Sequence, residues 1–256
     1  MTAMTQTETK AAKYATLNDL PQDLRAELFA FLLALTDTKQ RLGFQISHWV
    51  TGTPALEGAV GAAALAQDEL GHARSLYALL RTFPEAPESL NEENDLRSTR
   101  VRVHPDALDN RWDTWLKLVA MSVTLDAALQ EVFRAARDFS FAPLASLAVK
   151  INQEEKFHRV FGDTWLARLA ALDDTTREHL QKELNWAYPI AEAWLGNEVE
   201  SNLVREGILG ESLSDIRPRW RRELEDKVQQ SGLTVPAERT DWSHWDAERR
   251  EVLIPV

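Results

Sequence analysis

The sequence of 256 residues has no cysteine and only ten glycines and ten prolines. Without cysteine there can be no disulfides, zinc ribbons, iron–sulfur ligands or thiol nucleophile, and a reducing cytoplasm fits this composition. Few glycines and prolines, beside plentiful Ala, Leu and Glu, favour helices over sheets. No uninterrupted apolar run reaches about 18 residues, so no membrane-spanning helix is expected. The first fifteen residues also lack the apolar run of a signal peptide.

The charge of the chain is strongly acidic, with a formal net value of −11 at pH 7. A surface of this sign argues against nucleic acid and against anionic membranes as partners. The hydrophobic fraction of 44% is ordinary for a globular protein with a buried core. We therefore expect an acidic cytoplasmic protein that binds neither nucleic acid nor membrane.

The apolar residues repeat at steps of three and four, which is the spacing of amphipathic helices. We predict a mobile N-terminal tail at 1–17, a helical bundle at 18–232 and an extended C-terminal tail at 233–256. Within the bundle the spacing predicts helices at about 21–49, 54–83, 111–138, 143–172, 173–195 and 213–231. Residues 84–110 hold three prolines and form a long crossover between two helix pairs. This order predicts an all-α, ferritin-like four-helix bundle with extra C-terminal helices.

Two Glu-x-x-His motifs, Glu69–His72 and Glu155–His158, lie 86 residues apart in two of these apolar stripes. Glu and His three residues apart share one helix face, so each motif can offer two metal ligands to one point. A single such motif is usually an exposed polar pair. Two of them, together with Asp126 in the stripe of a third helix, are typical of a carboxylate-bridged centre for two iron or manganese ions.

Lys39 interrupts this pattern on the first helix. Asp126 precedes Glu155 by 29 residues and Lys39 precedes Glu69 by 30, so a lysine stands where the bundle needs its fourth acid. The nearest acid, Asp37, lies about 200° around the helix. A lysine in an apolar stripe is costly unless its ammonium meets an anion. We predict that Lys39 fills the first metal position, which leaves the centre without metal or with one ion.

The motif residues resemble those of the phenylacetic acid catabolic family, the ferritin-like subunits of bacterial phenylacetyl-CoA epoxidase. The run Gln67–His72, Asp126 and the run Glu154–His158 are similar to the catalytic A subunit, and so is Trp49, 20 residues before Glu69. That subunit has a glutamate ligand at the position of Lys39.

The length of the chain and its later part are more similar to the shorter C subunit, a structural, metal-free partner of A. The similar segments are Glu206–Ile208, the helix from Trp220 to Lys227, and Leu233–Pro236. The resemblance runs over roughly residues 25–236. Trp242 and Trp245 lie in the C-terminal tail, beyond this resemblance, which therefore says nothing of their role. Two tryptophans in a tail favour a segment that is docked on the protein surface.

Two functions follow from this resemblance. In the first, the chain is a scaffold subunit of a multicomponent phenylacetyl-CoA ring epoxidase in aerobic phenylacetate catabolism. It would pair with the homologous catalytic subunit, work beside further components that include a reductase, and need no cofactor of its own. In the second, it is a di-iron or single-metal monooxygenase subunit that binds iron through the two motifs and Asp126. In either case the chain could also form a homo-oligomer. A third possibility is a ferritin-like protein with another function.

Overall fold

The computed structural model describes residues 13–92, 100–136, 140–197, 201–236 and 240–253. The α-helices are α1 Gln22–Ser47, α2 Leu56–Leu80, α3 Trp115–Met121, α4 Ala127–Ala136, α5 Ala142–Ala170, α6 Asp174–Leu195, α7 Asn202–Arg205 and α8 Leu213–Gln230. A π-helical turn, Ser122–Asp126, joins α3 to α4, and short 3-10 turns lie at Leu17–Asp19, Glu88–Glu92, Asp106–Leu108 and Trp242–His244. The strands are β1 Trp245–Asp246 and β2 Glu251–Val252.

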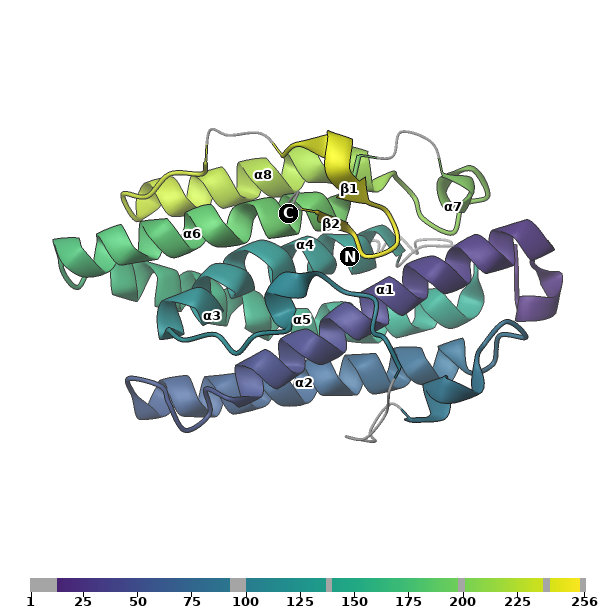
Figure 1. The fold of residues 1–256 in the computed structure, drawn as a ribbon, viewed down its shortest axis with the longest axis horizontal. Coiled ribbons are helices and arrows are strands. Elements are labelled where there is room, and N and C mark those ends of the chain that lie inside the picture. Colours follow the sequence, from purple (N-terminus) through teal and green to yellow (C-terminus); the bar gives the residue numbers. More distant parts are fainter. Residues whose placement is uncertain (1–12, 93–99, 137–139, 198–200, 237–239, 254–256) are drawn as a thin grey trace, which may run out of the picture.

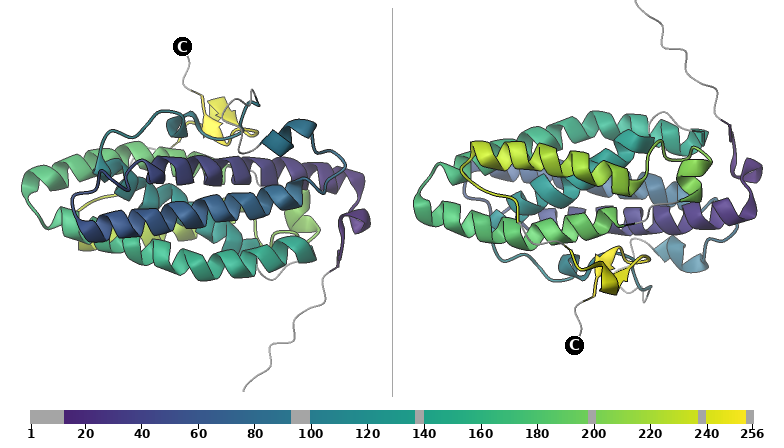
Figure 2. Two further views of the ribbon diagram at one scale, coloured as in Figure 1. Left: turned by 90° about the horizontal axis from the view of Figure 1, so that it is seen from below. Right: turned by 90° about the horizontal axis from the view of Figure 1, so that it is seen from above.

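The long helices lie roughly along one axis in stacked pairs (Figure 1). α1 and α2 pack side by side at one face, α3–α4 and α5 lie behind them, and α6 and α8 cover the far side, as both views in Figure 2 also show. The all-α bundle with additional C-terminal helices is confirmed. Among the described residues, no helix has both the length and the apolar content that crossing a bilayer requires.

The close approach of α2 and α5 depends on a missing side chain. A Cβ atom added to Gly61 of α2 would lie 2.5 Å from the ring of Phe161 on α5, which is well inside contact distance. Gly71, about three turns further along α2, would have no neighbouring atom within 4 Å of an added Cβ. The glycine at 61 therefore sets the distance between the two helices that carry the Glu-x-x-His motifs.

The third predicted helix, 111–138, is interrupted in the structure. It begins only at Trp115, where the hydroxyl of Thr114 caps it, and it changes to π-helical hydrogen bonding at Ser122–Asp126. A π-turn frees backbone groups from the regular pattern. The indole Nε1 of Trp220 on α8 donates to the carbonyl oxygen of Thr124 at 3.1 Å, so a helix distant in sequence stabilises the turn.

The predicted mobile tail at 1–17 is wrong for its last part. Residues 1–12 lie outside the described residues, but Tyr14 is buried and its backbone pairs with the segment that begins α5. Its hydroxyl donates to Glu206 Oε2 at 2.8 Å, where Lys13 also forms an ion pair. A buried ring with a satisfied hydroxyl outweighs the polar composition that suggested disorder.

The C-terminal segment forms a short hairpin of β1 and β2 that lies against the end of α6. Trp245 Nε1 donates to the carbonyl oxygen of Ala193 at 2.9 Å. Arg250 is buried, donates through Nε to the carbonyl of Trp194 at 2.6 Å, and places its guanidinium over the rings of Trp194 and Trp245. The segment predicted as an extended tail is thus docked through its aromatic residues.

Candidate metal centre

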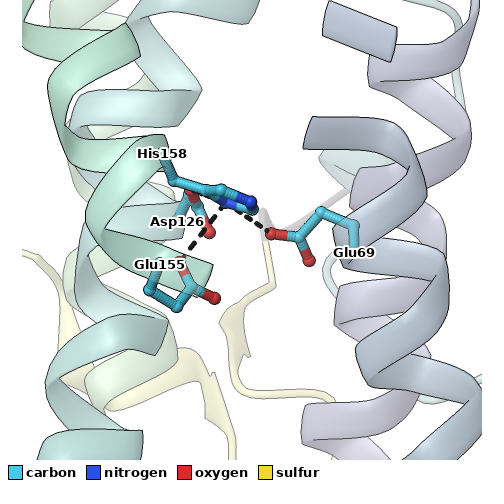
Figure 3. Close-up of side chains that lie close together, drawn as sticks. All are labelled: Glu69, Asp126, Glu155 and His158. Atoms are coloured by element: carbon cyan, nitrogen blue, oxygen red, sulfur yellow. Dashed lines mark hydrogen bonds and ion pairs between the residues drawn. The ribbon is translucent and has the colours of Figure 1, made fainter. Parts of the chain in front are cut away.

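The side chains that the sequence singled out meet inside the bundle. Figure 3 shows Glu69 reaching across from α2 toward three residues on the facing helices. All six side chains are buried: Lys39 from α1, Glu69 and His72 from α2, Asp126 from the π-turn, and Glu155 and His158 from α5. The centre therefore draws on every helix of the four-helix bundle.

Lys39 lies among the carboxylates and has no exposed surface. Its Nζ donates to three oxygen atoms: Glu155 Oε1 at 2.6 Å, Glu69 Oε1 at 2.8 Å and Asp126 Oδ1 at 3.1 Å. An ammonium has three N–H donors, so each one has a carboxylate acceptor. Burial alone would lower the pKa of Lys39, but the negative charges of the three acids outweigh it and hold that pKa well above its usual value. The lysine is therefore a permanent cation in the interior.

Five consecutive residues of α1, Thr36–Gln40, are buried because α1 is covered on all sides. Asp37 faces away from the centre, as its angle on the helix predicted. Its carboxylate accepts two hydrogen bonds from Arg100, at 2.6 and 2.9 Å, and one from the backbone N–H of Val103 at 2.7 Å. Tyr77 also donates to Asp37. This network, which sequence analysis missed, fixes the crossover to α1 and α2.

The two motif histidines differ in their protonation. Nδ1 of His158 lies 3.1 Å from Asp126, 3.3 Å from Glu69 and 3.3 Å from Glu155. Burial would lower the pKa of His158, but the charge and hydrogen bond of Asp126 outweigh it and raise that pKa above the usual range. Burial, together with the charge of Lys39, instead lowers the pKa of His72 to about 2. His158 is thus a second buried cation, whereas His72 is neutral.

The acids that precede each motif glutamate contact the histidine of the other motif. Glu154 Oε2 lies 2.9 Å from Nε2 of His72, and Asp68 Oδ2 lies 3.4 Å from Nε2 of His158. Both carboxylate side chains are about one-third exposed, at 35% and 33%. They reach the histidines from the solvent side, so the two motifs are cross-linked by pairs that approximately mirror one another.

The buried charges of the centre nearly balance without any ion. Three carboxylates face Lys39 and protonated His158, which leaves one negative charge in excess. Burial raises the pKa of Glu69, and it raises the pKa of Glu155 to about 8. Burial thus disfavours the charged form of both glutamates, and the charges of Lys39 and His158 oppose that effect.

The ligand atoms of Glu69, Asp126, Glu155 and His158 lie within 4.8 Å of one another, which is a spacing that could hold a metal ion. The ammonium of Lys39 contacts three of these side chains at hydrogen-bonding distance, so a metal ion would have to compete with it for the same carboxylate oxygen atoms. A metal ligand must also offer a lone pair, and the same three carboxylates around Nδ1 of His158 raise the pKa of this side chain, so binding of a metal there would have to displace a proton. These residues, in this arrangement, do not fit a two-metal centre.

The fold and the centre define a class of protein: a ferritin-like helical bundle whose carboxylate–histidine centre is closed by an internal ammonium. The family model described as "Phenylacetic acid catabolic protein" matches residues 4–252. The chain belongs to the phenylacetic acid catabolic protein family. It is also similar to the C subunit of 1,2-phenylacetyl-CoA epoxidase from Escherichia coli (strain K12), with 26% identity over 217 residues that span 83% of this chain and 85% of the relative.

Proposed function

We propose that this protein is the structural, non-catalytic ferritin-like subunit of a multicomponent phenylacetyl-CoA epoxidase that serves aerobic phenylacetate catabolism in the cytoplasm. Membership of the family and the similarity to a protein named as the C subunit of this epoxidase both support the proposal. The role is that of a scaffold: a rigid bundle that binds and positions the subunit on which the chemistry takes place.

The single observation that carries the proposal is the position of Lys39. Its ammonium neutralises the acids that a catalytic relative would use to hold metal, and it does so with three short hydrogen bonds. No cofactor is then needed to keep the bundle closed. The alternative, an iron-dependent monooxygenase, keeps five residues of metal-ligand type but requires Lys39 to leave a fully buried position.

The proposed partners are a homologous catalytic ferritin-like subunit, in a heteromer, and further components of the epoxidase that include a reductase. The scaffold contributes no redox step in this scheme. Lys39 and the residues around it hold the four helices at fixed distances, because each of three helices supplies an acid to one ammonium on the fourth.

The experiment is coexpression with the catalytic ferritin-like subunit of the same organism. We expect the two chains to copurify, iron to follow the partner, and ring epoxidation of phenylacetyl-CoA to require both chains together with the reductase. The isolated protein should hold at most one iron per chain and show no turnover. Turnover by the isolated protein with a reductase, or failure of the two chains to associate, would refute the proposal.

A further inference from the structure

The outer surface of α2 and α5 carries most of the exposed apolar side chains of this protein. In the described part of the chain eight large hydrophobic residues are exposed, and five of them belong to these two helices. They are Leu56 and Val60 on α2 and Val149, Phe157 and Val160 on α5. Single exposed apolar residues are ordinary, whereas several on neighbouring helices are typical of an interaction surface. We call the surface formed by Leu56, Val60, Phe157 and Val160 the α2–α5 face.

The α2–α5 face follows the line along which the two helices are in closest contact. A Cβ atom added to Gly58 would lie 2.9 Å from the ring of Trp165. One added to Gly61 would lie 2.5 Å from the ring of Phe161, so the two helices run in opposite directions. The rings of Phe157 and Phe161 are 6.4 Å apart. The exposed apolar residues of both helices therefore flank the same short contact line.

α2 offers small residues for the approach of another helix. Val60, Ala64, Gly71 and Ala78 follow one another at steps of four and seven, which places them on one stripe of the helix. All four are exposed or half-buried, and a Cβ added to Gly71 would meet no atom within 4 Å. In the left view of Figure 2, α2 lies in front, between α1 and α5. Because side-chain size sets the distance between packed helices, this stripe suits a partner that is itself helical.

The α2–α5 face also lacks the acidic excess of the protein. With histidines counted as neutral, the two helices hold five basic and six acidic residues, and two of these acids, Glu69 and Glu155, are buried. The surface of the pair thus has four acids against five bases, and the rest of the chain carries −10 of the total of −11. A partner meets no repulsive charge here. A second copy of this chain would bring the same acidic remainder, and its repulsion favours a different subunit.

The size of the surface matches that of a stable protein interface. α2 has 25 residues and α5 has 29, so the shorter helix is about 37 Å long. Two helices side by side, each about 10 Å across, then present about 750 Å². Specific interfaces bury about 800 Å² of each partner. The ion pairs Glu57–Arg168 and Lys150–Glu154 join charged residues of the same two helices beside the apolar residues, and could form the polar rim that such interfaces have.

We infer that the α2–α5 face binds the homologous catalytic ferritin-like subunit, which contributes a pair of its own helices to the contact. This assignment rests on the proposed function and adds to it the surface on which the partner lies. Phe157, Val60 and Val160 form the apolar centre of the interface. The contact also places the partner beside the two helices that carry the Glu-x-x-His motifs.

The test measures the affinity of the purified full chain for the catalytic subunit of the same organism by biolayer interferometry. Val60→Glu and Val160→Glu should each raise the dissociation constant about tenfold or more, because each would bury a carboxylate without a partner in the interface. Val101→Glu is the matched control. Val101 is 79% exposed, but it lies in the crossover beside Arg100, which pairs with Asp37 of α1. Its substitution should change the affinity less than about twofold.

Two further measurements separate the loss of contact from other effects. Val60 and Val160 are 64% and 63% exposed, so both glutamate variants should keep the thermal midpoint of the wild type. Val60→Ile keeps an apolar side chain and should bind the catalytic subunit within about threefold of the wild type. Sedimentation of the isolated wild type and of both glutamate variants shows whether the same face joins two copies of this chain.

Three results would overturn the inference. If the wild type binds the catalytic subunit and both glutamate variants bind it equally well, the face is wrong and the proposed function stands. If both variants weaken binding no more than Val101→Glu does, the effect belongs to added charge in general. If the isolated wild type is a dimer that both variants dissociate while the catalytic subunit still binds them, the face joins two copies instead. Failure of the wild type to bind the catalytic subunit at all would refute the proposed function as well.

Discussion

Replacing Lys39 by methionine removes the ammonium and keeps an unbranched side chain of similar reach. The three carboxylates then lose the cation that donates a hydrogen bond to each of them, at 2.6–3.1 Å. Removing one partner of a buried ion pair costs about 3–5 kcal/mol, because the remaining charges stay buried without compensation. For a protein of this size the midpoint of thermal unfolding should fall by about 6–20 °C.

Replacing Lys39 by glutamate should change the metal chemistry. Four carboxylates balance two divalent ions, and the variant then has an acid on each of the four helices beside the two motif histidines. We expect the metal-free variant to be even less stable than Lys39→Met. Added Fe²⁺ or Mn²⁺ should restore stability, by about 2.7 kcal/mol when the free ion is a hundredfold above its dissociation constant.

The assay combines thermal unfolding, with and without chelator, and metal analysis by mass spectrometry. Lys150→Met is the matched control, because that lysine is 63% exposed and its loss should change stability by less than about 0.5 kcal/mol. The reasoning would be refuted if Lys39→Met unfolded within about 1 kcal/mol of the wild type. It would equally fail if the wild-type chain kept two tightly bound iron ions after treatment with chelator.

Other features of the structure give further predictions. Asp37→Ala should lower the free energy of unfolding in urea by about 3–5 kcal/mol, because the buried guanidinium of Arg100 loses its carboxylate partner. The variant should also expose the crossover around Arg100 to protease, and an unchanged digestion pattern would contradict this. Gly61→Ala should lower the free energy of unfolding by about 1–3 kcal/mol, since its Cβ meets the ring of Phe161. Gly71→Ala, which has free space around the added Cβ, should instead raise that free energy by about 0.5–1 kcal/mol. Calorimetry on both variants measures the difference, and equal effects would exclude the packing argument. Burial lowers the pKa of His104 below its ordinary 6.5, so the folded state binds fewer protons than the unfolded chain in acid. Stability should therefore decline as pH falls below 6.5, by up to about 1.4 kcal/mol per pH unit, and His104→Gln should lose this part of the decline in urea unfolding between pH 8 and pH 5.

The helices of the bundle could be predicted because their apolar residues repeat strictly. The predicted boundaries 54–83 and 213–231 lie within three residues of α2 and α8 as the structure has them. The positions of Glu69 and Glu155 on inward faces followed from the same repeat, since a motif in an apolar stripe must face the core.

Contacts between segments far apart in the sequence could not be predicted in this way. The π-turn that carries Asp126 depends on Trp220, which lies 96 residues away from the carbonyl that it stabilises. The partners of Asp37 come from a crossover with no repeating pattern, and Tyr14 owes its burial to Ser140 and Glu206. Local periodicity contains no information about such pairs.

The sequence by itself determined that a lysine interrupts a set of acids and histidines on four helices, because spacing alone assigns each residue to a helix face. Only the tertiary structure decided what that lysine does. Its effect depends on distances of 2.6–3.1 Å to acids on three other helices. Those distances also decide which histidine carries a proton, since the strength of each interaction falls steeply with separation and rises with burial.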